Sequence, residues 1–381
     1  MGLGRFVFTA VLPMMQDSAG VSAGAGSLLA TGNYLGYLVG ALVAMALGAS
    51  VERRVVWRVA GSALVASLVL MALTEHLWWW LAFRAVAGVA SALLFIVVVR
   101  VIVRATWSHH HAGWAYGGVG AGIVLSSLIA TICDLIGGWR AAWVLTGLVA
   151  AVLLVAGPPG RAAVPDITTD DRDLTPGDRE VTHPGGGHRT HARLFAVLVA
   201  CYFLEGAGYI IAGTFLVATA HANSAPWVAH SLWLIVGVAA VPSCVLWAWL
   251  SHHLSRPMLL MIALALQAAG IALTGASTGT ASVIATGLLF GGTFMGATTL
   301  ALAAGNDLAI PASVAILSAA YAIGQVAGPG AVTPLLAHGY QPALLGAAGI
   351  VALSATLAAL LHLRFPRHLP RPAPASGATA A

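Results

Sequence analysis

Long apolar runs follow one another along the chain, and short polar stretches separate them. Many runs exceed about 18 residues, the length at which a helix can cross a hydrocarbon core roughly 30 Å thick. Backbone groups inside a bilayer must pair within their own segment, which helices achieve. The short alternating segments typical of an outer-membrane barrel do not occur in the sequence. The pattern therefore predicts an all-α polytopic membrane protein.

Twelve transmembrane helices are expected, six on each side of one long hydrophilic break. The expected spans are 1–16, 23–47, 56–74, 78–103, 114–134, 141–157, 194–220, 227–250, 258–274, 281–304, 312–336 and 342–363. The break is rich in Pro, Gly and Asp and poor in large apolar residues, so it is expected to be a disordered cytoplasmic linker. The expected organisation is an N-terminal half (1–157), this linker (158–193), a C-terminal half (194–364) and a cytoplasmic tail (365–381).

Composition and charge agree with this class. Hydrophobic residues make up 59% of the chain and charged residues only 8%, against about 25% charged residues in soluble domains. With the linker in the cytoplasm, Arg140 alone lies outside, Arg5 and Arg84 lie within spans, and every other arginine falls on the inner side, as the positive-inside rule requires. We expect a multi-pass protein of the cell inner (plasma) membrane with both termini cytoplasmic. Topology explains the net charge of +5, and nothing in the charge pattern indicates nucleic-acid binding.

The two halves show signs of an internal repeat. Shifting the chain by 204 residues aligns several landmarks without a gap, namely Gly2 with Gly206, Gly4 with Gly208, Ser27 with Ser231, Gly88 with Gly292 and Gly120 with Gly324. These matches pair spans 1, 2, 4 and 5 with spans 7, 8, 10 and 11 in the same order and orientation. A parallel repeat of two six-helix halves is the architecture of the major facilitator superfamily.

Four segments carry a resemblance to a known family. GRFVFTAVLPMM (4–15), GNYLGYLVGAL (32–42) and CYFLEGAGYIIAGTFLV (201–217) resemble the YbfB/YjiJ-like branch of the major facilitator superfamily, and LAFRAVAGV (81–89) resembles the superfamily's span-4 pattern. The resemblance covers nearly the whole chain and implies the major facilitator fold and a secondary transporter. The span 2–3 loop lacks the aspartate of the superfamily's signature, and GQVAGPG (324–330) lies in span 11 rather than span 5. Import and export therefore both stay open.

The first span is short, and two readings compete for it. A signal peptide would fit its single arginine and apolar core, but the segment around Arg5 has a repeat partner in span 7. We therefore expect an apparently truncated first helix that lacks its inner half, with further apolar codons upstream in the gene. Arg5 would then lie near a free helix end at the bilayer centre and would be wetter than in an intact protein.

Glu205 is the single charge in the span 194–220. It lies about 17 Å into that helix, and Arg5 lies about 15 Å below the outer edge of span 1, so both are expected at the bilayer midplane. Burial there costs about 3 kcal/mol, so both side chains should face the bundle interior. One reading is a structural ion pair. The other is that Glu205 alternates between an Arg5-paired ionised state and a protonated state, while Gly206 and Gly208 keep side chains out of a central cavity.

Further polar residues within the spans are candidates for a substrate or proton pathway. They are Asn33, Tyr34, Tyr37, Arg84, Tyr209, Tyr321 and Gln325. Packing roles compete for each of them, and Gln267 is expected only to link helices. Gly324, Gly328 and Pro329 form a candidate hinge, because proline removes a helical hydrogen bond and clashes with the preceding turn.

No metal or cofactor site is expected. His109, His110 and His111 point in different directions on a helix, and His252 and His253 lie in an inner loop. Cys133, Cys201 and Cys244 should be free thiols, and no P-loop, dinucleotide fingerprint or nucleophile elbow occurs. Of two function classes, a monomeric secondary transporter of an anionic or neutral polar small molecule is favoured, with proton coupling. The alternative is a non-transporting sensor or membrane-embedded enzyme.

Overall fold

The computed structural model describes residues 2–52, 54–104, 109–157, 187–223, 226–277, 279–308, 310 and 312–365. This part of the chain forms twelve α-helices and one short 3₁₀ helix, and it contains no strand. The helices are α1 (Gly2–Ala19), α2 (Ala23–Leu47), α3 (Arg54–Met71), α4 (Leu77–Arg104), α5 (His109–Ile136), α6 (Gly138–Ala156), α7 (Gly187–Asn223), α8 (Pro226–Leu250), α9 (Arg256–Ala276), α10 (Thr280–Asp307), α11 (Ser313–Leu336) and α12 (Tyr340–Arg364). The predicted all-α fold is confirmed.

Eleven of these helices, α2 to α12, contain a segment long and apolar enough to cross a membrane. The helix α1 is not among them, because its 18 residues include Arg5, Gln16 and Asp17. Most helix ends fall within a few residues of the expected span edges, and α2 begins and ends at the predicted residues.

The predicted end of the linker is wrong. Helix α7 begins at Gly187 rather than near residue 194, so residues 187–193 are helical. The last proline before this helix is Pro184, and downstream of it no residue prevents the helix from extending beyond the apolar segment. The rest of the expected linker (158–186) and the tail after Phe365 lie outside the described residues.

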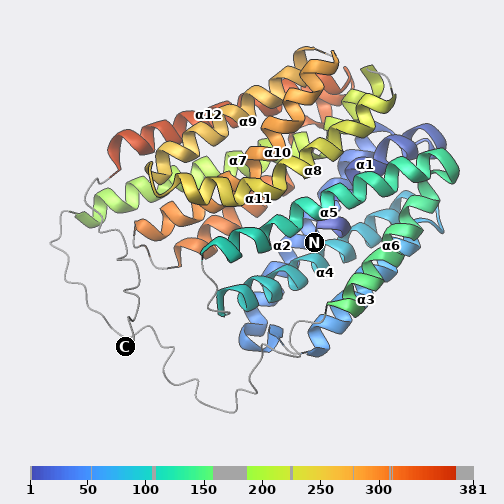
Figure 1. Ribbon diagram of the computed structural model, residues 1–381, viewed down its shortest axis with the longest axis horizontal. Helices are drawn as coiled ribbons and strands as arrows, with labels where there is room; N and C mark the ends of the chain where they lie inside the picture. Colours follow the sequence, from blue (N-terminus) through green and yellow to red (C-terminus); the bar gives the residue numbers. More distant parts are fainter. Residues whose placement is uncertain are drawn as a thin grey trace, which may run out of the picture.

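The helices form two bundles, α1–α6 and α7–α12, that lie side by side (Figure 1). Each bundle uses the same pairings in the same order. Helix α2 packs on α4 as α8 packs on α10, α1 packs on α5 as α7 packs on α11, and α3 packs on α6 as α9 packs on α12. The parallel repeat expected from the sequence is therefore present in the packing.

Glycines allow the closest of these helix crossings. A methyl group on Gly88 of α4 would overlap the carbonyl oxygen of Asn33 on α2, and one on Gly291 of α10 would overlap the carbonyl of Val236 on α8. The 204-residue shift pairs Gly88 with Gly292, yet a Cβ on Gly292 would meet nothing within 4 Å. The packing repeat is thus displaced by one residue from the sequence repeat at this crossing.

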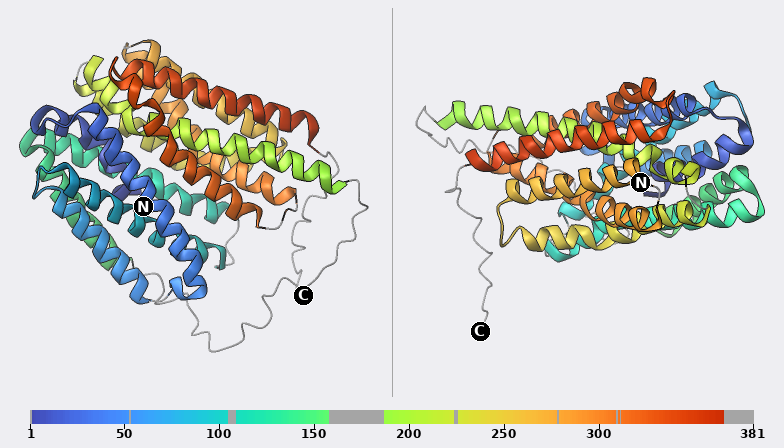
Figure 2. Two further views of the ribbon diagram at one scale, coloured as in Figure 1. Left: turned by 180° about the vertical axis from the view of Figure 1, so that it is seen from behind. Right: turned by 90° about the horizontal axis from the view of Figure 1, so that it is seen from above.

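The two halves meet mainly through α5 with α8, α2 with α11, and α1 with α7. Thr9 Oγ1 donates to the carbonyl of Gly213 over 2.5 Å, Ser27 Oγ donates to the carbonyl of Pro329 over 2.8 Å, and Gln16 Nε2 donates to the hydroxyl of Tyr340. Figure 2 shows the halves converging at the end where α1 passes into α2 and separating toward the end where α7 begins. The bundle is therefore joined at the end remote from the start of α7.

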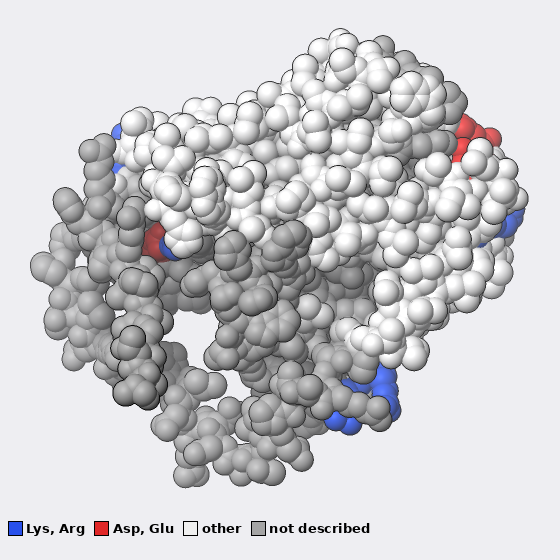
Figure 3. Space-filling model, viewed as in Figure 1, with Lys and Arg blue, Asp and Glu red and all other residues white. Residues whose placement is uncertain are grey.

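The surface suits a hydrocarbon surrounding. On the face shown in Figure 3, the charged side chains of the described residues lie at the margins. Large apolar side chains are exposed elsewhere on the helices, with exposed fractions of 80% for Leu135, 79% for Ile136 and 83% for Val155. Such side chains are stable in contact with lipid, so the chain is a multi-pass membrane protein.

Candidate functional site

Arg5 is buried, with an exposed fraction of 5%, although it lies close to the start of α1. Gly2 and Gly4 leave room for α1 to press against α5 and Leu64. Every residue of α1 from Gly2 to Met15 is therefore buried, including the first turn.

The guanidinium of Arg5 has one hydrogen bond and several ring contacts. Its NH2 group donates to Gln325 Oε1 over 2.7 Å. Its Cζ atom lies 5.0 Å from the ring centroid of Tyr34, 4.6 Å from that of Tyr37 and 5.6 Å from that of Phe6. Cation–π contacts of this kind contribute about 0.5–2 kcal/mol each. Nε of Arg5 has no partner among the described residues.

The hydrogen bond from Arg5 determines the orientation of the Gln325 amide. Arginine can only donate, so the oxygen of the amide must face it. The NH2 group of Gln325 is then directed elsewhere, and it too has no partner among the described residues. The side chain itself is 2% exposed. Gln325 thus joins α11 to α1 and presents a buried, unused donor.

Arg84 on α4 is the most isolated buried charge in the described part of the chain. It is 1% exposed, and its Cζ lies 4.6 Å from the ring centroid of Phe8 on α1. None of its three guanidinium nitrogens has a hydrogen-bond partner among the described residues. A buried arginine within a membrane span is costly, and such residues are rarely without a partner.

Asn33 and Tyr34 of α2 have different partners. Asn33 Nδ2 donates to the backbone carbonyl of Arg84 over 2.8 Å, so the amide links α2 to α4. The hydroxyls of Tyr34 and Thr214 are 3.3 Å apart. Thr214 already donates to the carbonyl of Ile210, so Tyr34 is the donor in this contact between the two halves. Tyr37, by contrast, is only partly buried.

Glu205 lies in the C-terminal half and is 1% exposed. Gln267 Nε2 donates to its Oε1 over 3.0 Å, and Thr293 Oγ1 lies 3.4 Å from Gln267 Oε1. The second carboxylate oxygen, Oε2, has no partner among the described residues. The expected contact with Arg5 is not made in this conformation, because Arg5 bonds Gln325 instead. Gln267 links helices as expected, and it also binds the carboxylate, which sequence reasoning missed.

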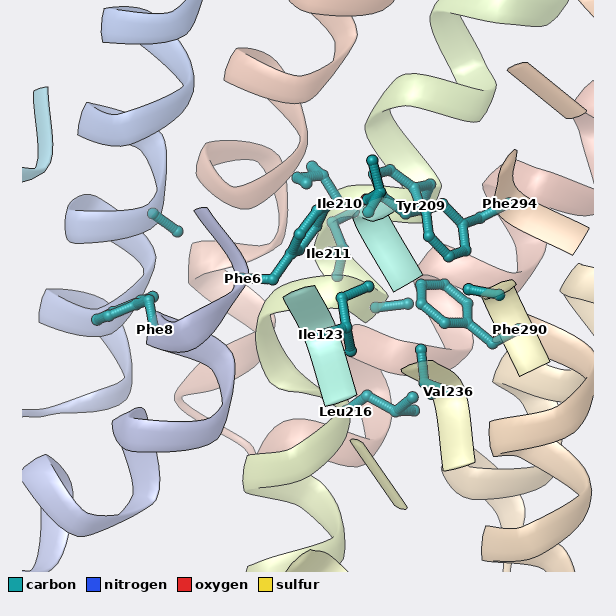
Figure 4. Packing of buried hydrophobic residues seen from close by; sticks show 14 of the residues in the cluster. Phe6, Phe8, Ile123, Tyr209, Ile210, Ile211, Leu216, Val236, Phe290 and Phe294 are labelled. Carbon is teal, nitrogen blue, oxygen red and sulfur yellow. The ribbon is translucent and has the colours of Figure 1, made fainter. Parts of the chain in front are cut away.

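An aromatic cluster occupies the space between α1, α7, α10 and α11. The ring of Tyr209 stacks on Phe290 at 5.6 Å and on Phe294 at 5.4 Å, and Tyr321 stacks on Tyr202 at 4.5 Å. Figure 4 shows Phe6 on the same side as Tyr209 and Phe294, whereas Phe8 points to the other side of α1. Sequence reasoning found the tyrosines but missed the phenylalanines, although Phe290 and Phe294 share one helix face at i and i+4.

Two glycines of α7 have a different role from the expected one. A Cβ on Gly206 would overlap the carbonyl of Tyr321 on α11, and one on Gly208 would lie 3.0 Å from the carbonyl of Ala347 on α12. They allow close helix packing and do not keep a cavity open, because the atoms opposite them belong to neighbouring helices.

The candidate hinge in α11 is also closely packed. Cβ atoms on Gly324 and Gly328 would overlap the carbonyls of Phe203 and Ala207 on α7. Pro329 lies within α11, and its carbonyl accepts hydrogen bonds from Ser27 at 2.8 Å and Thr333 at 3.0 Å. The segment therefore contacts both α7 and α2. Any motion of one half relative to the other would change its contact with α2.

The described residues contain no group of three or more His, Cys, Asp or Glu side chains placed to hold a metal. Cys133, Cys201 and Cys244 are free and buried, as expected. The side chains of His109, His110 and His111 lie outside the described part of the chain.

Comparison with known proteins shows a likeness to membrane transporters. Residues 1–360 match the family model described as "Uncharacterised MFS-type transporter YbfB". Among solved structures, a point mutant of the nucleoside transporter NupG superposes with a TM-score of 0.69 at 12% sequence identity, covering 96% of this chain and 98% of that one. At this identity the likeness concerns the fold alone. Comparison with curated protein sequences gives no significant match.

Proposed function

Because this chain belongs to the YbfB family of MFS-type transporters, we propose that it is a secondary active transporter of a small molecule, coupled to protons. The two halves would alternate access to a site between them, as parallel-repeat transporters do. The supporting observation is the environment of Glu205, the buried carboxylate of the described residues.

Glu205 can hold a proton with little rearrangement. Its Oε1 accepts a hydrogen bond from Gln267 in either protonation state, while Oε2 has no partner among the described residues and can take the proton. A carboxylate so deeply buried needs either a proton or a nearby positive charge. In this conformation Arg5 is bonded to Gln325. The proposed cycle has a second conformation in which Arg5 faces Glu205 and the proton is released.

The contacts between the halves indicate what must change in that cycle. Three of these contacts lie toward the end of the bundle that is remote from the start of α7. They join Thr9 to Gly213, Ser27 to Pro329 and Gln16 to Tyr340. With the linker in the cytoplasm, as the arginine distribution favours, this end is the outer one. Both termini would then be cytoplasmic, and the protein in this conformation would be closed toward the outside. We propose separately that it is a monomer of the inner (plasma) membrane.

The test begins with uptake and efflux profiling of a deletion strain over a metabolite panel, which supplies the substrate. The purified full chain is then reconstituted in liposomes. Glu205→Gln should abolish substrate accumulation driven by a pH gradient but leave substrate exchange without a gradient largely intact. The matched control is Glu75→Gln, which removes an exposed carboxylate paired with Arg140.

Normal accumulation by Glu205→Gln would make Glu205 structural, as would loss of folded protein in that variant. Absence of any flux through the wild-type protein would favour the alternative classes, a membrane sensor or a membrane-embedded enzyme.

A further inference from the structure

We propose that the transported molecule is an organic monoanion, with a carboxylate that binds Arg5 and Arg84 and a flat apolar body that lies against the aromatic cluster of α7 and α10. This inference rests on the proposed transport function and adds the chemical class of the substrate. Three observations support it: the balance of buried charges, the buried hydrogen-bond donors without partners, and the aromatic side chains next to Arg5.

The buried charges of the described residues do not balance. Arg5, Arg84 and Glu205 are the only charged side chains among their buried groups. The two guanidinium groups lie near the same stretch of α1, because that of Arg84 lies over the ring of Phe8, three residues after Arg5. With Glu205 ionised, one positive charge is left over, and with Glu205 protonated, as proposed for this conformation, two are. A ligand with a negative charge offsets one of them in either state, and a neutral ligand offsets none.

The unused hydrogen-bonding groups near the two arginines are mostly donors. The donors are Nε of Arg5, all three guanidinium nitrogens of Arg84 and Nε2 of Gln325, and none has a partner among the described residues. The exception is an acceptor, Oδ1 of Asn33, whose amide bonds the backbone carbonyl of Arg84. Each donor is buried, so leaving it unpaired is costly. A carboxylate accepts only, and its two oxygens match the paired donors of a guanidinium group. This donor set therefore favours a planar oxyanion.

The ring contacts of the arginines leave these donors available. Phe8 lies under the Arg84 guanidinium at 4.6 Å, and Tyr37 lies under that of Arg5 at the same distance. A neighbouring ring offsets part of the charge of a guanidinium group but supplies no acceptor for its N–H groups. These N–H groups still need an acceptor, which a carboxylate can supply.

The wall beside Arg5 is aromatic. Phe6, the next residue along α1, lies 6.4 Å from Phe294 and 6.2 Å from Trp233, measured between ring centroids. Phe294 stacks in turn on Tyr209 (Figure 4). A flat apolar group attached to the carboxylate could lie on these rings with offset-stacked or edge contacts. Chloride or phosphate would use the charges but not the wall.

Binding can be tested with benzoate as the probe and benzamide as its uncharged isostere. The thermal unfolding midpoint of the purified full chain in detergent is measured at constant ionic strength. Benzoate should raise the midpoint by a few degrees, because it binds the folded state, and benzamide and chloride should not. Arg84→Gln should weaken the apparent affinity for benzoate about tenfold or more. Arg140→Gln, which removes an arginine from an exposed ion pair, should bind like the wild type.

Arg84→Lys and Arg5→Gln keep the test decisive if Arg84→Gln fails to fold. Lysine retains the charge but loses the planar fork, and glutamine at position 5 removes the charge, so both variants should bind benzoate more weakly than the wild type. The proposal is overturned if benzoate produces no rise, if benzamide or chloride produces an equal one, or if these variants bind benzoate unchanged.

Failure of the inference can be told apart from failure of the proposed function. If benzoate binding depends on Arg84 but no gradient-driven flux occurs in liposomes, the anion site is supported and the transport function is contradicted. If a neutral solute accumulates in a way that depends on Glu205 but benzoate has no effect, the transport function is supported and the anion site is contradicted.

Discussion

Arg5 on α1 donates a hydrogen bond of 2.7 Å to Gln325 on α11, and this bond joins the two halves of the molecule at a buried position. The repeat equivalents of these positions, Tyr209 and Ala121, differ in character from the pair itself. The two halves are therefore alike in helix packing but not in chemistry. The N-terminal half supplies two buried cations, and the C-terminal half supplies the buried carboxylate.

Replacing Gln325 by alanine should destabilise the protein by about 1–3 kcal/mol, because the variant leaves a buried guanidinium donor without its acceptor. Unfolding of the purified protein in denaturant measures the change. The control is Thr356→Ala, whose exposed hydroxyl bonds only the carbonyl of Ala352 in its own helix. If Arg5→Ala and Gln325→Ala prove additive in a double-mutant cycle, the two side chains are not coupled.

Gly88→Ala should disrupt the crossing of α2 and α4, because the added methyl group would overlap the carbonyl of Asn33. Overpacking of this kind costs about 1–3 kcal/mol, measurable as a lower unfolding midpoint. Gly292→Ala is the matched control at the repeat-equivalent position, where a Cβ meets nothing within 4 Å. Equal midpoints for the two variants would contradict the close crossing.

A short bifunctional thiol reagent should stop transport in a Gln16→Cys, Tyr340→Cys double variant. These positions are in contact across the two halves, so the cross-link would hold that end of the bundle closed. A reducible reagent allows activity to be restored. In the control, Ser255→Cys with His362→Cys, the side chains are 3.2 Å apart within the C-terminal half. Cross-linking there should leave transport unchanged, and inhibition in both pairs would argue against the closure.

Pro329→Ala should alter the rate of conformational switching more than the affinity for substrate, because the substitution restores a helical hydrogen bond in α11. Its carbonyl also accepts from Ser27 on α2, so a change in local geometry would reach the other half. Transport rate and substrate binding are measured separately. Pro334→Ala, at an exposed position of the same helix, is the control. Unchanged kinetics in Pro329→Ala would reduce this proline to a packing feature.

The sequence alone determined the fold class and the helices of this protein. Apolar runs long enough to cross a bilayer leave the backbone little alternative to helix, so the spans and their order could be predicted from hydrophobicity. Burial of Glu205, Arg84 and Gln325 could be predicted for the same reason, since each interrupts an apolar segment. The parallel repeat could be predicted from a few glycines that align when the chain is shifted by 204 residues.

The tertiary structure alone decided which buried groups meet. Glu205 pairs with Gln267 rather than Arg5 because α9, distant in sequence from α7, brings an amide to the carboxylate. Gly206 and Gly208 face neighbouring helices, and Arg5 is covered because α1 packs tightly from its first turn. Hydrophobicity fixes the depth of a residue in the bilayer. The rotation of each helix and its neighbours, which depend on side-chain packing, fix the partner that the residue meets.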